Sequence, residues 1–477
     1  MRVLSTIRDW LYGPVLPTEY EALTVDGEAV AQQRARITRI QAAWEVYAKG
    51  GRSPLRTAPG TPDDNTIVNF CRVIVDKSAD FLFGKSIEFD VVGEHEAEEE
   101  WLDEVWRANQ REILLHDMAV NGAVTGDVFM RVVQDPEWEY PRLINIDPGT
   151  IYALWDPDDI ERVMEYRIEW VGVDPERGKS VSRRQTITRH NGTWTITDWV
   201  AYDRDTDWRM MGQEVWPYAW CPVFKAKNLP APNEFYGTPD LTEDIIHMND
   251  RVNFIASNTT KIIRHHAHPK TWGRGFTSRE VDMAPDTVTI IHNTDGTLQN
   301  LEMHSDLQSS LNWYKYLVGG LHTIARVPEV ATGRVESLGQ LSGVALEILY
   351  GPIVDKTRTK RNLYGRMLNQ MNQCLLEMHG VSGRRCDIRW SDPWPVDDLT
   401  QAQIGIMHHN LGVSLHTIQD ILGFDYEREE RLSETERPSG PVDTASNNGI
   451  TDTTVTRMAD IRPSRMARKT FTGTKGE

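Results

Sequence analysis

The sequence predicts an α+β fold in which a mixed α/β first half is followed by a second half of long helices. Short alternating or β-branched runs separated by turns fill residues 126–224, and this pattern is typical of β-strands. Apolar residues at helical spacing predict two long helices within residues 239–326, and another long helix begins near Ser342. With 477 residues the chain is too long for one ordinary domain, so we expect several structural parts.

Composition and charge exclude several classes of protein. The net charge of −18 repels phosphate, so we do not expect tight nucleic-acid binding over the whole surface. The four cysteines contain no C-x-x-C pair, which argues against a disulfide framework or a cysteine-rich zinc site and favours a reduced cytoplasm. We also find no apolar run long enough to span a bilayer, and no secretory signal pattern at the N-terminus.

The elements of the first half follow from local patterns. Residues 28–48 place apolar side chains at helical spacing and predict a helix. The segment NTIVNFCRVIVDKSADFLFG predicts a second helix that stops at Gly84, and SIEFDVV then alternates as a strand does. An acidic segment from Glu94 to a glycine-rich end near residue 126 predicts a helix with a solvated face. Within the β region, Asn191-Gly192 predicts a hairpin turn.

The two helices that flank residues 265–305 carry narrow apolar seams. In each helix the apolar residues alternate at spacings of four and three, which is a heptad pattern. Such seams favour side-by-side packing with neighbours over burial in a globular core. The predicted seam residues are Leu241, Ile245, Met248, Val252, Ile255, Leu311, Tyr314, Val318 and Leu321.

A polar loop with several glycines, residues 327–341, precedes the third long helix. Its only charged residues are Glu329, Arg334 and Glu336, and it contains no histidine, cysteine or nucleophile–base pair. A catalytic lid would have nothing to cover here, so we interpret the loop as a mobile element between two helices. Pro352 predicts a kink in the helix that follows.

The C-terminal part predicts a short helical segment and a tail. Ser414 is a plausible N-cap for the segment that begins SLHTIQDIL. Beyond Pro438 the chain is rich in small polar residues with a few basic ones, which predicts a disordered tether.

Motifs for chemistry are scarce. The sequence has no phosphate-binding loop, no G-x-S-x-G and no H-E-x-x-H. His265, His266 and His268 lack a carboxylate within their cluster and follow a helix end, where the helix dipole favours histidine, so we predict no metal site there. The basic run KTRTKR, residues 356–361, is interpreted as a salt-bridged helix face rather than a phosphate contact.

Several segments, taken in order over residues 30–437, resemble the portal proteins of long-tailed, siphovirus-type bacteriophages. They are NFCRVIVDKSADFLFGKSIEF, the two helices around a small excursion, RVPEVATGR, LSGVALEILYGPIVDKTRTKRNLY and VSLHTIQDILGFDYEREERLSE. The stretch Asp76–Lys85 and the pair Ser342-Gly343 are the most specific pieces. The resemblance implies a non-enzymatic ring, typically a dodecamer, at one capsid vertex. Double-stranded DNA, weakly bound, would pass through it during packaging and ejection.

The resemblance also divides the chain into parts with expected roles. These are an outer α/β wing (1–239), stem helices (240–264 and 306–326), a clip (265–305), a tunnel loop (327–341), a long kinked helix returning to the wing (342–396), a helical crown (397–437) and a flexible tail (438–477). Clip residues expected to dock partners are Lys270, Arg274, Arg279, Glu280 and Asp286. Tunnel-loop residues expected to line the channel are Val327, Glu329, Thr332, Gly333, Arg334, Glu336 and Gln340. With Arg334 as its only basic group, the loop is not expected to grip DNA strongly.

The expected partners are further copies of the chain, DNA, terminase, head-completion or adaptor proteins, and the major capsid and scaffold proteins. Assembly is expected in the host cytoplasm, without a membrane, cofactor or metal. Two alternatives stay open. One is a metal-dependent hydrolase that uses the HHAH run and scattered aspartates. The other is a different oligomeric head–tail adaptor, although adaptors are usually far shorter.

Overall fold

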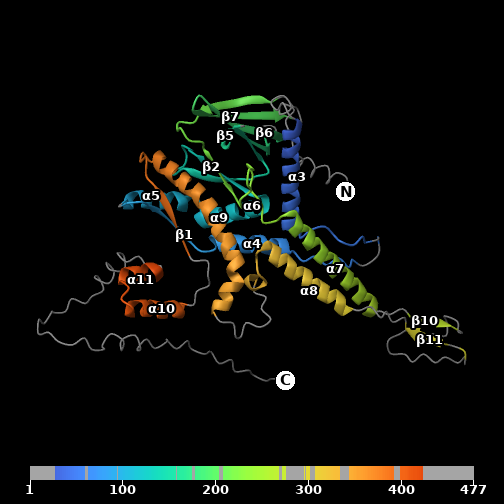
Figure 1. The fold of residues 1–477 in the computed structure, drawn as a ribbon. Helices are drawn as coiled ribbons and strands as arrows, with labels where there is room; N and C mark the ends of the chain where they lie inside the picture. Colours follow the sequence, from blue (N-terminus) through green and yellow to red (C-terminus); the bar gives the residue numbers. More distant parts are fainter. Residues whose placement is uncertain are drawn as a thin grey trace, which may run out of the picture. The chain divides into compact units, whose positions relative to one another are not determined.

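The structure of the protein is a computed structural model. The structure describes residues 27–57, 59, 63–93, 95–156, 158–174, 178–202, 208–267, 271–274, 295, 297–300, 307–332, 343–391 and 398–422. These residues form helices and mostly antiparallel sheets, as the predicted α+β class requires (Figure 1). The chain divides into two units, residues 1–393 and 394–477. Among the described residues, no helix is both long and apolar enough to cross a membrane.

The β-rich region consists of two antiparallel sheets that share one core. Five strands follow one another as a meander: β4 (Ile151–Asp156), β5 (Asp159–Val173), β6 (Ser180–His190), β7 (Thr193–Tyr202) and β8 (Arg209–Val215). In the second sheet, β2 (Asp127–Val133) lies between β3 (Arg142–Ile146) and β9 (Val223–Lys227). Apolar side chains from both sheets, among them Phe129, Tyr166 and Trp194, form one buried cluster. The predicted hairpin is confirmed, because Asn191 and Gly192 both have positive φ between β6 and β7.

Helices α3 (Gly27–Lys49) and α4 (Phe70–Phe83) confirm the first two helix predictions, with one shift. Helix α4 begins at residue 70 because the Asn69 side chain accepts a hydrogen bond from the Arg72 backbone N–H at 2.9 Å and caps it. The residues before Asn69, which the sequence pattern placed in the helix, are therefore extended. Strand β1 (Ile87–Val91) is present as predicted and pairs with β12 (Cys386–Trp390), which the sequence analysis did not identify.

The acidic segment forms two helices instead of one, α5 (Glu96–Ala108) and α6 (Arg111–Thr125). The break lies at Gln110, whose φ of 55° is left-handed and ends a regular helix. Helix α6 packs on β2 and α4 packs on α6, so these two helices connect the β-rich region to the helical second half.

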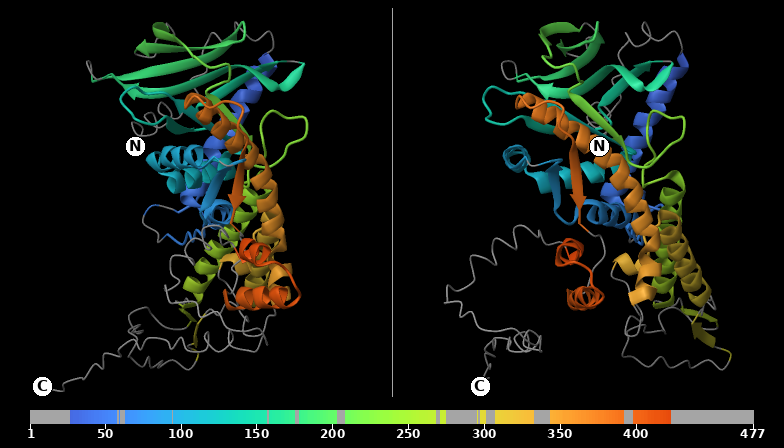
Figure 2. Two further views of the ribbon diagram at one scale, coloured as in Figure 1. Left: turned by 90° about the vertical axis from the view of Figure 1, so that its left-hand side faces the viewer. Right: turned by 60° about the vertical axis from the view of Figure 1, so that its left-hand side comes forward.

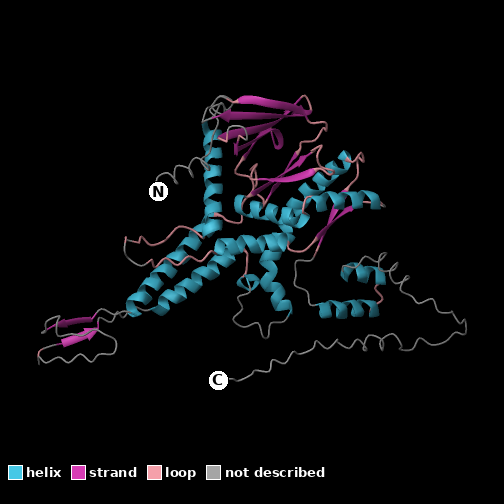
Figure 3. Ribbon diagram, turned by 180° about the vertical axis from the view of Figure 1, so that it is seen from behind, coloured by secondary structure: helices cyan, strands magenta, loops and turns pink. Residues whose placement is uncertain are grey.

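Helices α7 (Glu243–Ala267) and α8 (Leu307–Ala325) lie side by side as an antiparallel pair (Figure 1, Figure 2, Figure 3). Between them in sequence is a hairpin of β10 (Thr271–Arg274) and β11 (Thr297–Asn300). A 3-10 turn, η2 (Glu329–Thr332), follows α8, and α9 (Gly343–Met378) contains Pro352. The second unit contains α10 (Asp398–Asn410) and α11 (Leu415–Leu422), and the Ser414 hydroxyl caps α11 as predicted.

A polar ladder on α7 holds an extended segment along the helix. Asn249, Asn253 and Ser257 recur every four residues, so they share one face of α7, and all three are fully buried. The Asn253 carboxamide accepts from the Val68 backbone N–H and donates to the Gly50 carbonyl, both at 2.8 Å. Equivalent bonds join Asn249 to Gly50 and Phe70, and Ser257 to Thr66. Further along α7, Arg264 forms an ion pair with Asp64 at 2.7 Å, which also joins this segment to the helix.

Replacing Asn253 with alanine removes both hydrogen bonds and leaves the half-buried Val68 N–H without its partner, while the Gly50 carbonyl keeps its bond from Asn249. We expect the free energy of unfolding to fall by about 1–3 kcal/mol, measured by urea denaturation. Asn258→Ala is the matched control, because Asn258 lies on the same helix outside this ladder and should change stability little. Equal effects of the two substitutions would show that the ladder contributes nothing of its own.

Candidate functional site

The residue on which several elements converge is Asp240, just before α7. Its side chain is fully buried. One carboxylate oxygen accepts from the Lys360 ammonium at 2.6 Å, and the other lies 3.3 Å from the Lys356 ammonium. The Asn228 amide also donates to Asp240 at 3.2 Å, while the Asp240 backbone N–H donates to the Ala123 carbonyl at 2.7 Å. Thus Asp240, which lies just before α7, connects the end of β9 and α9 through its carboxylate and α6 through its backbone N–H.

The spacing of the partners on α9 explains how they converge. Lys356, Lys360 and Tyr364 are separated by four residues each, so they lie on one face of the helix. The Tyr364 hydroxyl donates to the Asn228 carboxamide at 3.1 Å, which orients the Asn228 amide toward Asp240. The interpretation of KTRTKR as a salt-bridged surface fits the exposed pair of Arg358 with Asp355, but Lys356 and Lys360 are buried.

The electrostatics of this cluster favour the charged carboxylate. Burial acts to raise the pKa of Asp240, but the ammonium groups of Lys356 and Lys360, with hydrogen bonds from Lys360 and Asn228, hold it well below its usual value. Burial, by contrast, lowers the pKa of Lys360 to about 8, although Asp240 opposes the shift. Two buried ammonium groups therefore share one carboxylate.

Lys356 also connects this cluster to the end of α8. Its ammonium donates to the carbonyl of Ala325, the last residue of α8, at 3.0 Å, and to the Ser78 hydroxyl on α4 at 3.2 Å. Helix α8 then closes with two hydrogen bonds typical of a left-handed cap, from Arg326 N–H to Thr323 and from Val327 N–H to His322. Arg326 takes the left-handed position, with φ 55°, where glycine is usual.

Most of the predicted seam residues are buried or partly buried within one chain. Val252 on α7 packs against Val318 on α8 in a buried cluster, and Met248, Ile255 and Tyr314 pack around it, partly buried. Leu241, Ile245 and Leu321 are also buried, whereas Leu311 is 46% exposed. The seams therefore join α7 to α8, and their role between copies of the chain remains a prediction.

The predicted tunnel-loop and clip residues are only partly described. Val327 is fully buried, next to the cap of α8, and its role in lining a channel remains a prediction. Glu329 and Thr332 lie half-buried in η2, where the Tyr350 hydroxyl donates to the Val330 carbonyl. In the clip, Arg274 is exposed on β10. The other predicted residues, Gly333, Arg334, Glu336, Gln340, Lys270, Arg279, Glu280 and Asp286, lie outside the described residues.

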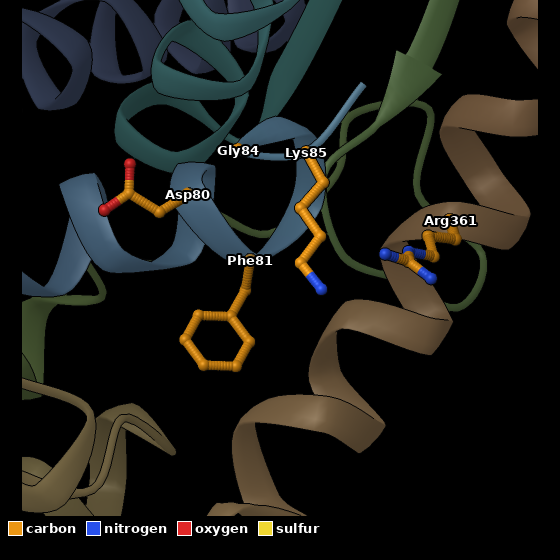
Figure 4. Close-up of a pocket in the computed structure, with 5 residues that line it drawn as sticks. All are labelled: Asp80, Phe81, Gly84, Lys85 and Arg361. Carbon is orange, nitrogen blue, oxygen red and sulfur yellow. The ribbon is translucent and has the colours of Figure 1, made fainter. Parts of the chain in front are cut away.

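A small pocket of about 230 Å³ lies between the end of α4 and α9 (Figure 4). Its lining includes Phe81, Lys85 and Arg361. The Arg361 guanidinium donates to the Ser391 carbonyl at 2.8 Å and lies over the Trp390 ring, so it holds β12 beside α9. The pocket is smaller than the usual range for ligand sites. The described ranges also contain no group of three or more potential metal ligands, so the hydrolase alternative gains no support from them.

Comparisons with protein families and with solved structures find matches to this chain. A family model described as "Phage portal protein, SPP1 Gp6-like" matches residues 28–437. A solved structure described as "Neck of empty GTA particle computed with C6 symmetry" is 12% identical, with a TM-score of 0.46, and covers 74% of this chain and 88% of that chain. One described as "Virion of native gene transfer agent (GTA) particle" is also 12% identical, with a TM-score of 0.45, and covers 81% and 99%. A search of curated proteins finds no match.

Replacing Asp240 with asparagine should be the most damaging single change in this cluster. It leaves two buried ammonium groups without a counter-charge, and we expect a loss of about 3–5 kcal/mol in the free energy of unfolding. Lys360→Met should cost less, because Asp240 keeps Lys356 as its partner. Urea denaturation of both variants checks this order, and a milder effect of the asparagine variant would contradict it.

The same cluster predicts a pH dependence at alkaline pH. The unfolded chain binds the Lys360 proton up to its ordinary pKa of about 10.5, whereas the folded chain releases it near pH 8. Between these values the unfolded state binds more protons, so stability relative to Lys360→Met should rise with pH. Unfolding curves of both proteins at pH 7 to 10.5 test this, and a constant difference would refute it.

Replacing Arg326 with glycine should stabilise the cap of α8. The left-handed backbone costs an L-residue roughly 1 kcal/mol, and glycine removes that cost. We expect a higher thermal midpoint for Arg326→Gly and no change for Arg326→Lys. A lower midpoint for the glycine variant would mean that the Arg326 side chain is needed for the fold.

Proposed function

The chain belongs to the SPP1 Gp6-like phage portal protein family, and from this premise we propose that its copies form a closed ring through which DNA enters and leaves the capsid. Portal proteins are structural components of the virion and sit at a capsid vertex. The observation that carries the proposal is the family match over residues 28–437, which covers every described element from α4 to α11 and nearly all of α3.

The order of elements supports the finer assignment. Residues 1–239 would form the wing, α7 and α8 the stem, and residues 265–305 the clip, where terminase and head-completion proteins dock. The segment 327–341 would be the tunnel loop, α9 would return to the wing, and residues 397–437 would form the crown. A typical ring of this kind has twelve subunits. Residues of the clip, such as the exposed Arg274 on β10, would contact those partners.

Electrostatics supports a passive conduit. Each chain carries a net charge of −18, and a ring of such chains repels the DNA backbone over most of its surface. Weak, transient contact suits DNA that must slide in both directions. Arg326, exposed just before residues 327–341, would add one cation that can touch phosphate without holding it. In this assignment the chain moves no DNA by itself, and the packaging motor is a separate protein.

The test of this proposal is the assembly state of the purified full-length protein. We expect native mass spectrometry to find a closed oligomer of about twelve chains, and negative-stain images to show a ring with a central hole. A protein that stays monomeric over a wide range of concentration, and that does not assemble with scaffold and capsid proteins either, would refute the portal ring. Stoichiometric bound metal in such a monomer would favour the hydrolase instead.

A further inference from the structure

The cap at the end of α8 departs from its usual form at two positions. In the common cap the left-handed residue is a glycine, and an apolar contact joins the residue after it to one in the last turn of the helix. Here the left-handed residue is Arg326, and the two residues in the positions of that contact are Val327 and His322. A residue with a Cβ atom is strained in the left-handed conformation, and histidine is less apolar than the usual partner. Other contacts must therefore hold this cap.

The His322 side chain supplies a second hydrogen bond to Val327. The His322 carbonyl accepts from the Val327 N–H at 3.1 Å, and the His322 Nδ1 atom lies 2.8 Å from the Val327 carbonyl oxygen. A carbonyl oxygen can only accept, so Nδ1 carries the proton and donates. Pro328 follows Val327 and restricts its backbone to extended conformations, which limits where this carbonyl can point. One buried histidine therefore holds both backbone groups of Val327.

The His322 ring is oriented in turn by α4. The Phe70 ring meets it edge-on, with the ring centroids 5.7 Å apart and an interplanar angle of 84°. Phe70 is the first residue of α4, and its backbone N–H donates to the Asn249 carboxamide of the polar ladder on α7 at 3.3 Å. The chain that leaves α8 is therefore joined to α4 and α7 through this one ring.

Helix α9 fastens the same stretch of chain. The Lys356 ammonium donates to the Ala325 carbonyl at 3.0 Å, just before the cap, and the Tyr350 hydroxyl donates to the Val330 carbonyl at 3.4 Å, just after it. Helices α4 and α9 both pack against η2. Contacts to three other helices thus surround the point where the chain leaves α8.

We propose that His322 is a positioning residue that fixes residues 326–332 to the end of α8, so that this stretch moves as one body with α8, the start of α4 and α9. A left-handed residue other than glycine persists only where the surrounding contacts hold it, and the bond from His322 to Val327 supplies that hold. The consequence rests on the proposed function. In the ring, residues 327–332 would be the rigid base of the tunnel-loop segment, whereas the sequence alone indicated a mobile element.

Two substitutions at His322 test the proposal in the purified full-length protein. His322→Phe keeps a ring against Phe70 but has no donor. His322→Asn restores a donor, because its amide nitrogen is as many bonds from Cα as the imidazole Nδ1. Hydrogen exchange measured by mass spectrometry follows the amides of Arg326 and Val327, which close the cap. We expect about 10-fold faster exchange in His322→Phe and nearly wild-type exchange in His322→Asn.

The matched control is Thr323→Ala. Thr323 is the next residue, it is exposed, and its hydroxyl donates within α8 to the Gly319 carbonyl at 2.8 Å, so this variant should exchange as the wild type does. Amides of the five-stranded sheet should exchange at the wild-type rate in every variant, which separates a local effect from general unfolding. Wild-type exchange in His322→Phe, or equally fast exchange in His322→Asn, would overturn the role of the histidine bond. Either result leaves the portal function intact, and a chain that forms no ring would refute that function without changing this measurement.

Discussion

The architecture of the first unit depends on one buried carboxylate. Asp240 brings two ammonium groups of α9 to the point where the β-rich region ends and α7 begins, while Lys356 also holds the last carbonyl of α8. A buried ion pair adds little net stability compared with apolar packing, but its loss is severe because a charge is left unpaired. We infer that the cluster fixes the position of α9 relative to α7 and α8 more than it adds to stability.

Helix α7 shows how these restraints make the α7–α8 pair rigid. One face packs its apolar seam against α8, and a second face holds the backbone of residues 63–70 through asparagine and serine. A third face carries Phe254, which is 41% exposed. Because Lys356 binds the carbonyl of Ala325, the last residue of α8, a displacement of α9 would act directly on the end of that helix. The positions of α8 and α9 are therefore coupled within each subunit.

The spacing of apolar residues in the sequence predicted most elements. The residues that α3, α4 or α8 buries on one face recur every three to four positions, so each helix can be recognised from its own segment alone. The break at Gln110 and the strand β12 were missed. The first depends on one left-handed residue, and the second depends on pairing with β1, nearly 300 residues earlier in the chain. The seam was recognised, but the sequence could not show whether its partner lies in the same chain. The cluster around Asp240 was missed for a similar reason, although Lys356, Lys360 and Tyr364 at four-residue spacing were a usable signal.

The position of the seam changes what a ring interface must look like. From the sequence alone, a heptad seam could pack against a neighbouring subunit or against another helix of the same chain. In this structure the seams of α7 and α8 pack against each other. A subunit in which α7 and α8 are already paired can associate with little ordering cost. In the proposed ring the interface then has to come from surfaces outside this seam, because Val252 and Val318 are already buried against each other within one chain.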